Sequence, residues 1–177
     1  MGVANSLIAV QAGAIQVQGT INGIGERCGN ANLCSIMANL ELKMKRTALG
    51  DGRLAQLRTI SNYVAEMANL TPNKRQPYVG DTAFAHKGGV HIHAVKKNPL
   101  TYEHVNPDVV GNHRRVLISD SSGRSAVLGK METFGLDLPQ DNPKVLELLD
   151  SLKTLEYEGY QFEGAEGSFE LLVRKAM

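Results

Sequence analysis

The sequence has no tryptophan, only two cysteines and no long apolar run, and each absence excludes a class of protein. Four phenylalanines and five tyrosines are too few to predict a surface on which nucleic-acid bases stack. Cys28 and Cys34 fit neither a C-x-x-C motif nor a zinc framework, and their spacing favours two reduced thiols over a disulfide. No apolar segment reaches the roughly 18 residues that span a bilayer. The N-terminal apolar stretch, interrupted by Asn5 and Gln11, does not have the shape of a signal peptide.

The charge of the chain is nearly balanced. Nineteen basic and 18 acidic residues leave a net charge of +1, which predicts neither a nucleic-acid nor a membrane partner. The small basic cluster of His113, Arg114 and Arg115 is more typical of a solvated face than of an anion site. Because 42% of the 177 residues are hydrophobic, we expect a folded protein of one domain or two small ones. The reduced thiols and the absence of a signal-peptide pattern predict a cytoplasmic location.

The first part of the chain alternates between helical and extended patterns. Apolar spacing predicts a helix over 1–13, and alternation over 16–21 predicts a strand. A polar, glycine-rich loop follows at 22–30, and helices are predicted from Ala31 and across 54–67. This order is typical of an α/β protein with parallel strands. Because a parallel strand needs neighbours on both sides, we expect an N-terminal portion of the domain to precede this sequence.

The rest of the chain divides into a linker and a helical region. Residues 72–113 contain all five histidines together with several prolines and glycines, which predicts loops with short helical pieces. Helices are predicted at 121–134 and 164–175. Between them, Asn142 before Pro143 is typical of a helix start, so a third helix is predicted from there to a stop at Gly159.

The glycine-rich loop is the first candidate site. A turn of this kind between a strand and a helix presents backbone N–H groups that can bind an anion. Its G-x-G-x-x-x-G spacing differs from the G-x-G-x-x-G dinucleotide fingerprint, which does not favour a nucleotide site. If the strand belongs to an α/β barrel, the loop lies at the active-site end, where Asn22, Glu26, Arg27 and Asn30 would face the substrate. The alternative is a tight turn with capping asparagines.

The second candidate site is the histidine-rich segment FAHKGGVHIH at 84–93. His91 and His93 would share one face of a strand and could ligate a metal, but no nearby acidic residue or cysteine completes the shell. A general acid or base role for one histidine and a structural role are the alternatives. Tyr102 lies eleven residues after His91 in the same linker, where a tyrosine is more often a packing residue.

Three segments, in this order, resemble the family of isopropylmalate, homocitrate and citramalate synthases. VANSL at 3–7 resembles the helix that follows the family's metal-binding motif, and TINGIGERCGNA at 20–31 resembles its last barrel strand and loop. HKGGVH at 86–91 resembles the catalytic motif of its linker. The resemblance covers essentially the whole chain.

The resemblance implies an α/β fold class. Residues 1–71 would be the last βα units of a (β/α)8 TIM barrel, 72–115 a linker subdomain with the catalytic residues, and 116–177 a second, helical linker subdomain. The family's metal-binding aspartate and His-x-His motif are not in this sequence, and its regulatory domain would follow Met177. We therefore expect this chain alone to be inactive.

The chemistry that the resemblance implies is an acyl transfer from acetyl-CoA to a 2-oxoacid, followed by thioester hydrolysis. A divalent metal, Mg²⁺ or Mn²⁺, would hold the 2-oxoacid and polarise its keto group. By the family pattern, Asn30 belongs to the metal site, His91 is the catalytic histidine, and Tyr102 works with it. Both linker residues would reach into a partner subunit, which implies a homodimer.

Within the family, Cys28, His93 and the 112–130 stretch resemble the citramalate branch, which condenses pyruvate with acetyl-CoA on a route to isoleucine. The isopropylmalate (leucine) and homocitrate branches are the alternatives. Two further hypotheses are a non-catalytic module that dimerises through its helical C-terminal half, and a small metal-binding protein built on His86, His91 and His93.

Overall fold

The computed structural model describes residues 1–118, 123–136, 138–139 and 141–177, which form two compact units. The first unit comprises Met1–Phe84 and Val105–His113, and the second comprises Ala85–His104 and Arg114–Met177. Across the described ranges the fold is mainly helical, with two short parallel strands. No helix in these ranges is both long enough and apolar enough to cross a membrane.

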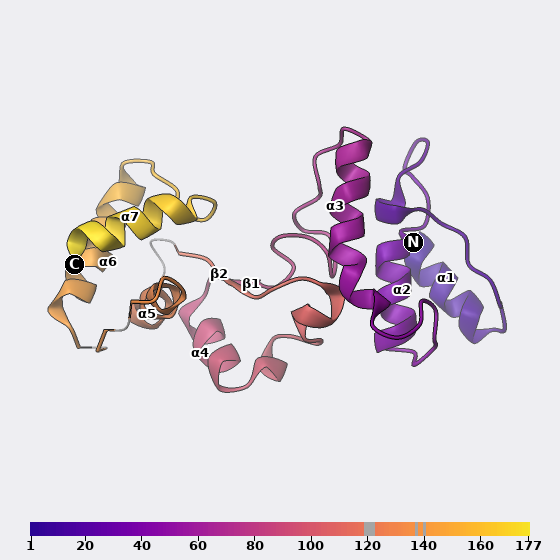
Figure 1. The fold of residues 1–177 in the computed structure, drawn as a ribbon, viewed down its shortest axis with the longest axis horizontal. Helices are drawn as coiled ribbons and strands as arrows, with labels where there is room; N and C mark the ends of the chain where they lie inside the picture. Colours follow the sequence, from indigo (N-terminus) through magenta and orange to yellow (C-terminus); the bar gives the residue numbers. More distant parts are fainter. Residues whose placement is uncertain (119–122, 137, 140) are drawn as a thin grey trace. The chain divides into compact units, whose positions relative to one another are not determined.

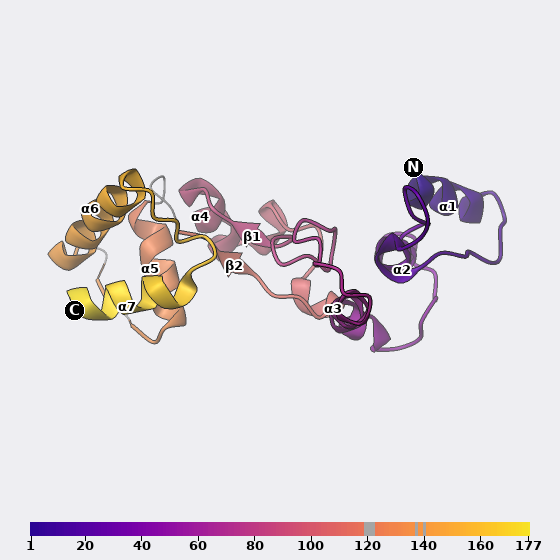
Figure 2. The ribbon, with the colours of Figure 1, turned by 90° about the horizontal axis from the view of Figure 1, so that it is seen from above.

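Three α-helices form the first unit, and they confirm the helices that the sequence predicts there. They are α1 (Gly2–Gln11), α2 (Leu33–Leu42) and α3 (Leu57–Met67), with 3₁₀ turns η1 (Ile21–Gly23), η2 (Arg53–Gln56) and η4 (Pro107–Val110). Helix α2 begins where the Asn32 side chain accepts a hydrogen bond from the Cys34 backbone N–H at 3.0 Å. Figures 1 and 2 show α1 lying beside α2.

The predicted strand at 16–21 is wrong for this structure. Over these residues the chain forms a single parallel bridge between Thr20 and Asn32, and Ile15 just before them is fully exposed. A parallel strand is stabilised by the ladders on its two sides. The alternation in the sequence fits a strand, but no strand in the described ranges pairs with residues 16–21.

A small core holds the first unit together and draws in the η4 turn. The Asn112 side chain after η4 is buried, and its amide nitrogen donates to the carbonyl oxygens of Tyr78 and Gly80 at 2.9 and 3.0 Å. These bonds attach η4 to the loop after α3. The buried apolar residues of this core are Cys34, Ala38, Leu54, Leu57, Tyr78, Val79, Phe84 and Val110.

The second unit starts with the linker segment that contains most of the histidines. Strand β1 (Ala85–His86) pairs in parallel with β2 (Arg115–Val116), and between them lie α4 (Gly89–Lys97) and the 3₁₀ turn η3 (Pro99–Thr101) (Figure 1). The prediction of short helical pieces in this region is confirmed. The two strands, each two residues long, are too short to leave a periodic signal in the sequence.

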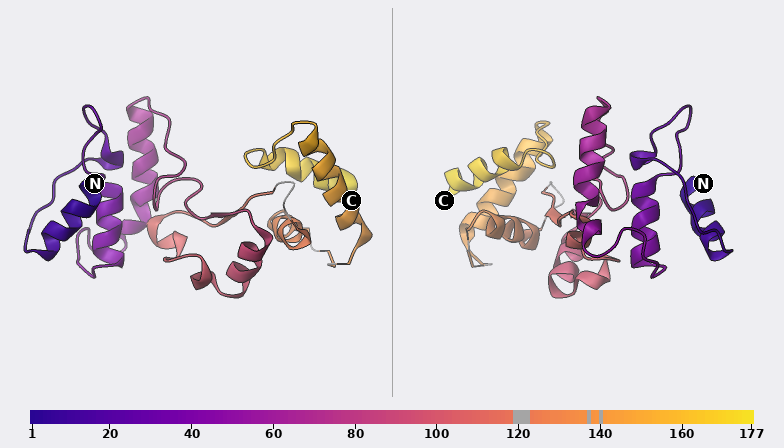
Figure 3. Two further views of the ribbon diagram at one scale, coloured as in Figure 1. Left: turned by 180° about the vertical axis from the view of Figure 1, so that it is seen from behind. Right: turned by 45° about the vertical axis from the view of Figure 1, so that its right-hand side comes forward.

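Three helices complete the second unit: α5 (Arg124–Thr133), α6 (Pro143–Tyr157) and α7 (Glu166–Ala176) (Figures 2 and 3). They confirm the predicted C-terminal helices, although residues 121–122 of the first one lie outside the described ranges. Asn142 caps α6 as predicted, accepting from the Lys144 backbone N–H at 3.0 Å. The buried core residues are Ile92, Ile118, Ala126, Val127, Met131, Val145, Leu148, Leu149, Leu152, Phe162, Phe169 and Val173.

Candidate functional site

The glycine-rich loop is shaped mainly by its own backbone. Its two ends are joined because the Thr20 N–H donates to the Ala31 carbonyl at 3.0 Å, and the Asn30 N–H donates to the Gly23 carbonyl at 2.9 Å. Asn22 adopts a left-handed backbone conformation with φ of 62°, a region that asparagine tolerates better than most residues. Gly29, with φ of 84°, has no room for a side chain, because a Cβ there would collide with the Gly23 carbonyl oxygen.

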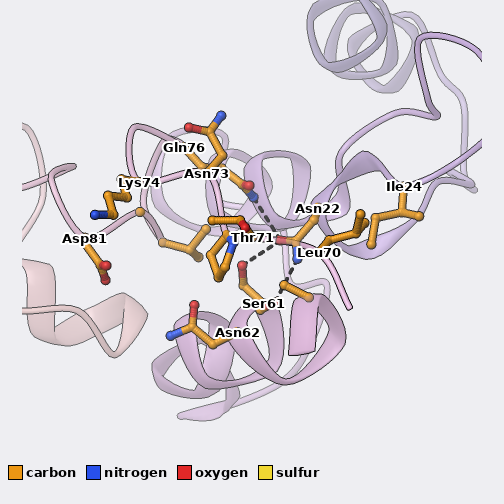
Figure 4. Close-up of a pocket in the computed structure, with 14 residues that line it drawn as sticks. Asn22, Ile24, Ser61, Asn62, Leu70, Thr71, Asn73, Lys74, Gln76 and Asp81 are labelled. Carbon is orange, nitrogen blue, oxygen red and sulfur yellow. Dashed lines mark hydrogen bonds between the residues drawn. The ribbon is translucent and has the colours of Figure 1, made fainter. Parts of the chain in front are cut away.

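Asn22 connects this loop to α3 and to the segment after it. Its side-chain oxygen Oδ1 accepts from the Ser61 hydroxyl at 2.6 Å and from the Gln76 amide at 3.1 Å, and lies 3.6 Å from the Cys34 sulfur. Its amide nitrogen donates to the Ser61 carbonyl at 2.7 Å. Figure 4 shows Ser61 and Gln76 pointing toward Asn22. The Asn22 carboxamide thus has a structural use, and its contact with substrate stays a prediction.

A small pocket of about 140 Å³ opens beside this cluster. Asn22, Ser61 and Gln76 lie in its wall together with exposed polar residues such as Lys74 and Asn73 (Figure 4). Cys34, beneath the cluster, is buried, and burial raises the pKa of its thiol. Because a thiol with a raised pKa is a poor nucleophile at neutral pH, the structure gives Cys34 a packing role.

The other predicted residues of the loop are exposed. The Arg27 guanidinium lies 2.6 Å from the Glu26 carboxylate, in an ion pair at the surface. Asn30 donates through its side-chain nitrogen to the Ile24 carbonyl at 3.2 Å. That bond uses the amide nitrogen and not Oδ1, the atom with which a carboxamide ligates a hard cation such as Mg²⁺. Asn30 can therefore supply one metal ligand without breaking its contact with the loop.

One carboxamide oxygen is not a metal site. In the part of the chain that the structure describes, His, Cys, Asp and Glu side chains form no group of three or more that could hold a metal ion. Mg²⁺ and Mn²⁺ bind through several oxygen ligands, including charged ones. The described residues can therefore supply one ligand to a divalent cation, and the cation would need its other ligands from elsewhere.

The structure brings His91 and Tyr102 together. His91 lies in the first turn of α4 and Tyr102 directly follows η3, and their rings are in contact with centroids 4.2 Å apart and planes inclined by 31°. Both side chains are exposed. The pair thus presents an imidazole and a phenol, which can transfer a proton and donate a hydrogen bond, side by side at the surface of the second unit.

The shared face expected for His91 and His93 is wrong. The segment from Gly89 onward is the helix α4, in which residues two apart point roughly 200° apart around the axis. Residues two apart share one face in a strand, but they do not do so in a helix. The structure thus pairs His91 with Tyr102 and not with His93.

Sequence reasoning missed a buried ionic cluster next to this pair in the sequence. Glu103, only 3% exposed, accepts from Arg114 through Nε at 2.6 Å and Nη2 at 2.7 Å, and its Oε1 lies 3.0 Å from His86 Nε2. Burial by itself raises the pKa of Glu103, but the hydrogen bonds and positive charge of Arg114 and His86 outweigh it and lower the pKa below its ordinary value. The sequence shows only that His86 and Glu103 are close along the chain to His91 and Tyr102, and closeness along the chain does not reveal that they are buried.

Two family models match consecutive parts of the chain. The model described as HMGL-like matches residues 1–64, and the model described as homocitrate synthase post-HMGL domain-like matches residues 78–159. The (R)-citramalate synthase of Geobacter sulfurreducens is 59% identical over 175 residues, which are 99% of this chain and 33% of that protein. The chain belongs to the citramalate and 2-isopropylmalate synthase family.

Other relatives in this family fall into two named groups. The (R)-citramalate synthase of Synechocystis sp. is 55% identical over 175 residues, covering 99% of this chain and 32% of that protein. The 2-isopropylmalate synthase of Sulfolobus acidocaldarius is 37% identical over 166 residues, covering 94% of this chain and 42% of that protein. The chain spans about a third of the length of the citramalate synthases that it matches.

Proposed function

We propose that this chain carries the catalytic linker of an acetyl-CoA-dependent 2-oxoacid synthase, with pyruvate as the 2-oxoacid and citramalate as the product. The observation that carries the proposal is the exposed contact between His91 and Tyr102. The names of the relatives support the substrate, because five (R)-citramalate synthases are 46–59% identical to this chain and three 2-isopropylmalate synthases are 37–39% identical.

The two side chains suit the steps that follow carbon–carbon bond formation. The His91 imidazole can take a proton from the water that attacks the thioester carbonyl, and can return a proton to the departing CoA thiolate. The Tyr102 hydroxyl can donate a hydrogen bond to the oxyanion that develops on that carbonyl. A bound divalent cation would supply polarisation of the keto group, with Asn30 as one of its ligands.

The expected domain order is part of this proposal. Residues 1–71 supply the last part of a TIM barrel, 72–115 the catalytic linker, and 116–177 the second linker subdomain. The HMGL-like match over 1–64 supports the barrel assignment, since that family consists of TIM-barrel enzymes. The exposure of His91 and Tyr102 supports a site that is completed by a barrel in a partner subunit, and hence a homodimer.

The test is a measurement of CoA release from acetyl-CoA in the presence of Mg²⁺. Pyruvate, 2-oxoisovalerate and 2-oxoglutarate are supplied in turn, first to this chain alone and then to its mixture with the separately produced N-terminal part of the Geobacter sulfurreducens relative. We expect no release from the chain alone, because among the described residues Asn30 contributes a single metal ligand and no group of His, Cys, Asp and Glu completes a site. In the mixture we expect release with pyruvate.

The matched variants are His91→Ala and His93→Ala, which remove the same side chain from two positions on α4. We expect His91→Ala to reduce pyruvate-dependent release by about 100-fold or more, as is typical for loss of a general acid or base. His93→Ala should retain it. Equal activity in the two variants would refute the role of His91, and release with 2-oxoisovalerate instead of pyruvate would keep the family chemistry and change the substrate to that of a 2-isopropylmalate synthase.

A further inference from the structure

His91 and Tyr102 belong to two segments that are also joined through a buried carboxylate, that of Glu103. His86, five residues before His91, and Glu103, the residue after Tyr102, are joined through their side chains at 3.0 Å. Both are at least nine-tenths buried, whereas His91 and Tyr102 are exposed. Each exposed residue of the ring pair is therefore close in sequence to one member of the buried pair.

The carboxylate of Glu103 takes part in three hydrogen bonds. Arg114 binds it in a bidentate pair, donating two N–H groups to its two oxygens, a geometry that gives an arginine–carboxylate pair both strength and directional specificity. An ionised carboxylate only accepts hydrogen bonds, so His86 Nε2 is the donor in the third bond. Three donors hold the carboxylate in place, and because the side chain itself is buried, they also restrain the backbone to which it is attached.

The anchor is also attached to the core of the second unit. Arg114 immediately precedes β2, whose parallel pairing with β1 brings His86 opposite Val116. The first residue of β2, Arg115, donates to Glu166 of α7 at 2.7 Å, and the same carboxylate lies 3.1 Å from Lys130 of α5. A movement of Glu103 would thus have to displace β1, β2 or the helices against which they are held.

We propose that Glu103, held by Arg114 and His86, is a positioning residue that keeps the His91 and Tyr102 rings in contact. In this role the carboxylate acts through the backbone and transfers no proton. It fixes the backbone at Tyr102 and at the entry to α4, so that the two rings meet without the loss of conformational entropy that two exposed side chains on mobile segments would incur. The catalytic importance of this arrangement rests on the proposed function, but its geometry does not.

The experiment reads the contact directly, in this chain and without substrate. Stacked rings shift one another's proton resonances upfield, so the ring signals of His91 and Tyr102 report their contact in an NMR spectrum, and the His86 signals report the anchor. The variants are Glu103→Gln, which keeps the shape of the side chain but removes its charge, and Arg114→Lys, which keeps the charge but cannot form the bidentate pair. Glu132→Gln is the matched control, because Glu132 pairs with Lys96 of α4 at 2.6 Å on the surface.

We expect both anchor variants to move the His91 and Tyr102 ring signals toward their values in unstructured peptides, while Glu132→Gln leaves them in place. The methyl signals of Val127, in the core, show whether the unit is still folded. If the His86 signals change and those of His91 and Tyr102 do not, the proposal is wrong. If both anchor variants lose the core signals, Glu103 serves only stability and the proposal is equally overturned.

A kinetic readout separates this proposal from the proposed function. If the mixed assay releases CoA, Glu103→Gln should lower kcat by about 10-fold to 100-fold with little change in KM for pyruvate, because misplaced catalytic groups slow the chemical step. In a His91→Ala background the same substitution should add almost nothing. A mixture that releases no CoA with any 2-oxoacid, together with the expected NMR shifts, would refute the proposed function and leave the positioning role in place.

Discussion

Two segments of this protein carry the predicted site residues, and they reach their shapes by different means. The loop at 20–32 of the first unit is folded largely by backbone hydrogen bonds and left-handed residues such as Asn22 and Gly29. The segment at 85–104 of the second unit is held by side chains, through the cluster around Glu103. The difference teaches that a local motif can describe the first kind of site, whereas the second kind depends on an arginine ten residues beyond the segment.

The largest effect is expected in the loop. Gly29→Ala adds a Cβ that collides with the Gly23 carbonyl oxygen at a left-handed φ, and should lower the free energy of unfolding of the first unit by about 4 kcal/mol. Gly50→Ala is the matched control, since Gly50 has the same φ of 84° but open space around the added atom. It should cost only about 1 kcal/mol in urea unfolding. Equal costs would show that the conformation, and not the close approach, is what requires glycine at position 29.

The next effect tests the side-chain anchor of the second unit. Arg114→Met leaves the Glu103 carboxylate buried without its main partner, and should cost about 3 kcal/mol, at the lower end for a broken buried pair because Arg114 is itself partly exposed. Adding Glu103→Gln should recover part of the loss, since the unpaired charge is then gone. Urea unfolding followed through the second unit measures both values, and a double variant no more stable than the single one would argue against a charge effect.

A side-chain anchor also exists in the loop, and its removal should have a smaller effect. Asn22→Gly keeps the left-handed backbone but takes the acceptor from the buried Ser61 hydroxyl and the Gln76 amide, at a cost of about 2 kcal/mol. The control is Asn30→Ala, which removes one hydrogen bond at an exposed position and should cost about 0.5 kcal/mol. If both cost the same in thermal unfolding, Asn22 matters through its backbone alone.

The smallest effect is a dependence of stability on acid. The pKa of Glu103 is lowered in the folded state, so its carboxylate stabilises the fold above its unfolded pKa of about 4.3, and this contribution is lost as the pH falls through the lower folded value. The unfolding free energy of the second unit should therefore fall more steeply below about pH 4.3 in the unmodified chain than in Glu103→Gln. Parallel curves for the two proteins, measured by urea unfolding at a series of pH values, would contradict the lowered pKa.

Much of the helical structure follows from local sequence signals. The stripe of leucines after Asn142 and Pro143 predicts α6 and its capped start, because a helix and its cap depend on residues only a few positions apart. The strand prediction at 16–21 failed for the opposite reason, since a strand requires partners that its own residues do not supply. The segment around His91 contains Gly88 and Gly89, which weaken any helical signal, and its helix α4 is stabilised by burying Ile92 and Val95.

The candidate site divides in the same way. The resemblance selected His91 and Tyr102, and the structure places their rings in contact, while their catalytic roles stay predictions. The sequence by itself determined the family, the helices other than α4 and the two motif segments, because each is a pattern of nearby residues. Only the tertiary structure decided that Asn22 is bonded to Gln76, 54 positions away, and that Glu103 is buried between His86 and Arg114. Burial and long-range hydrogen bonds are set when distant segments pack together, and no local pattern records which polar side chain will be enclosed.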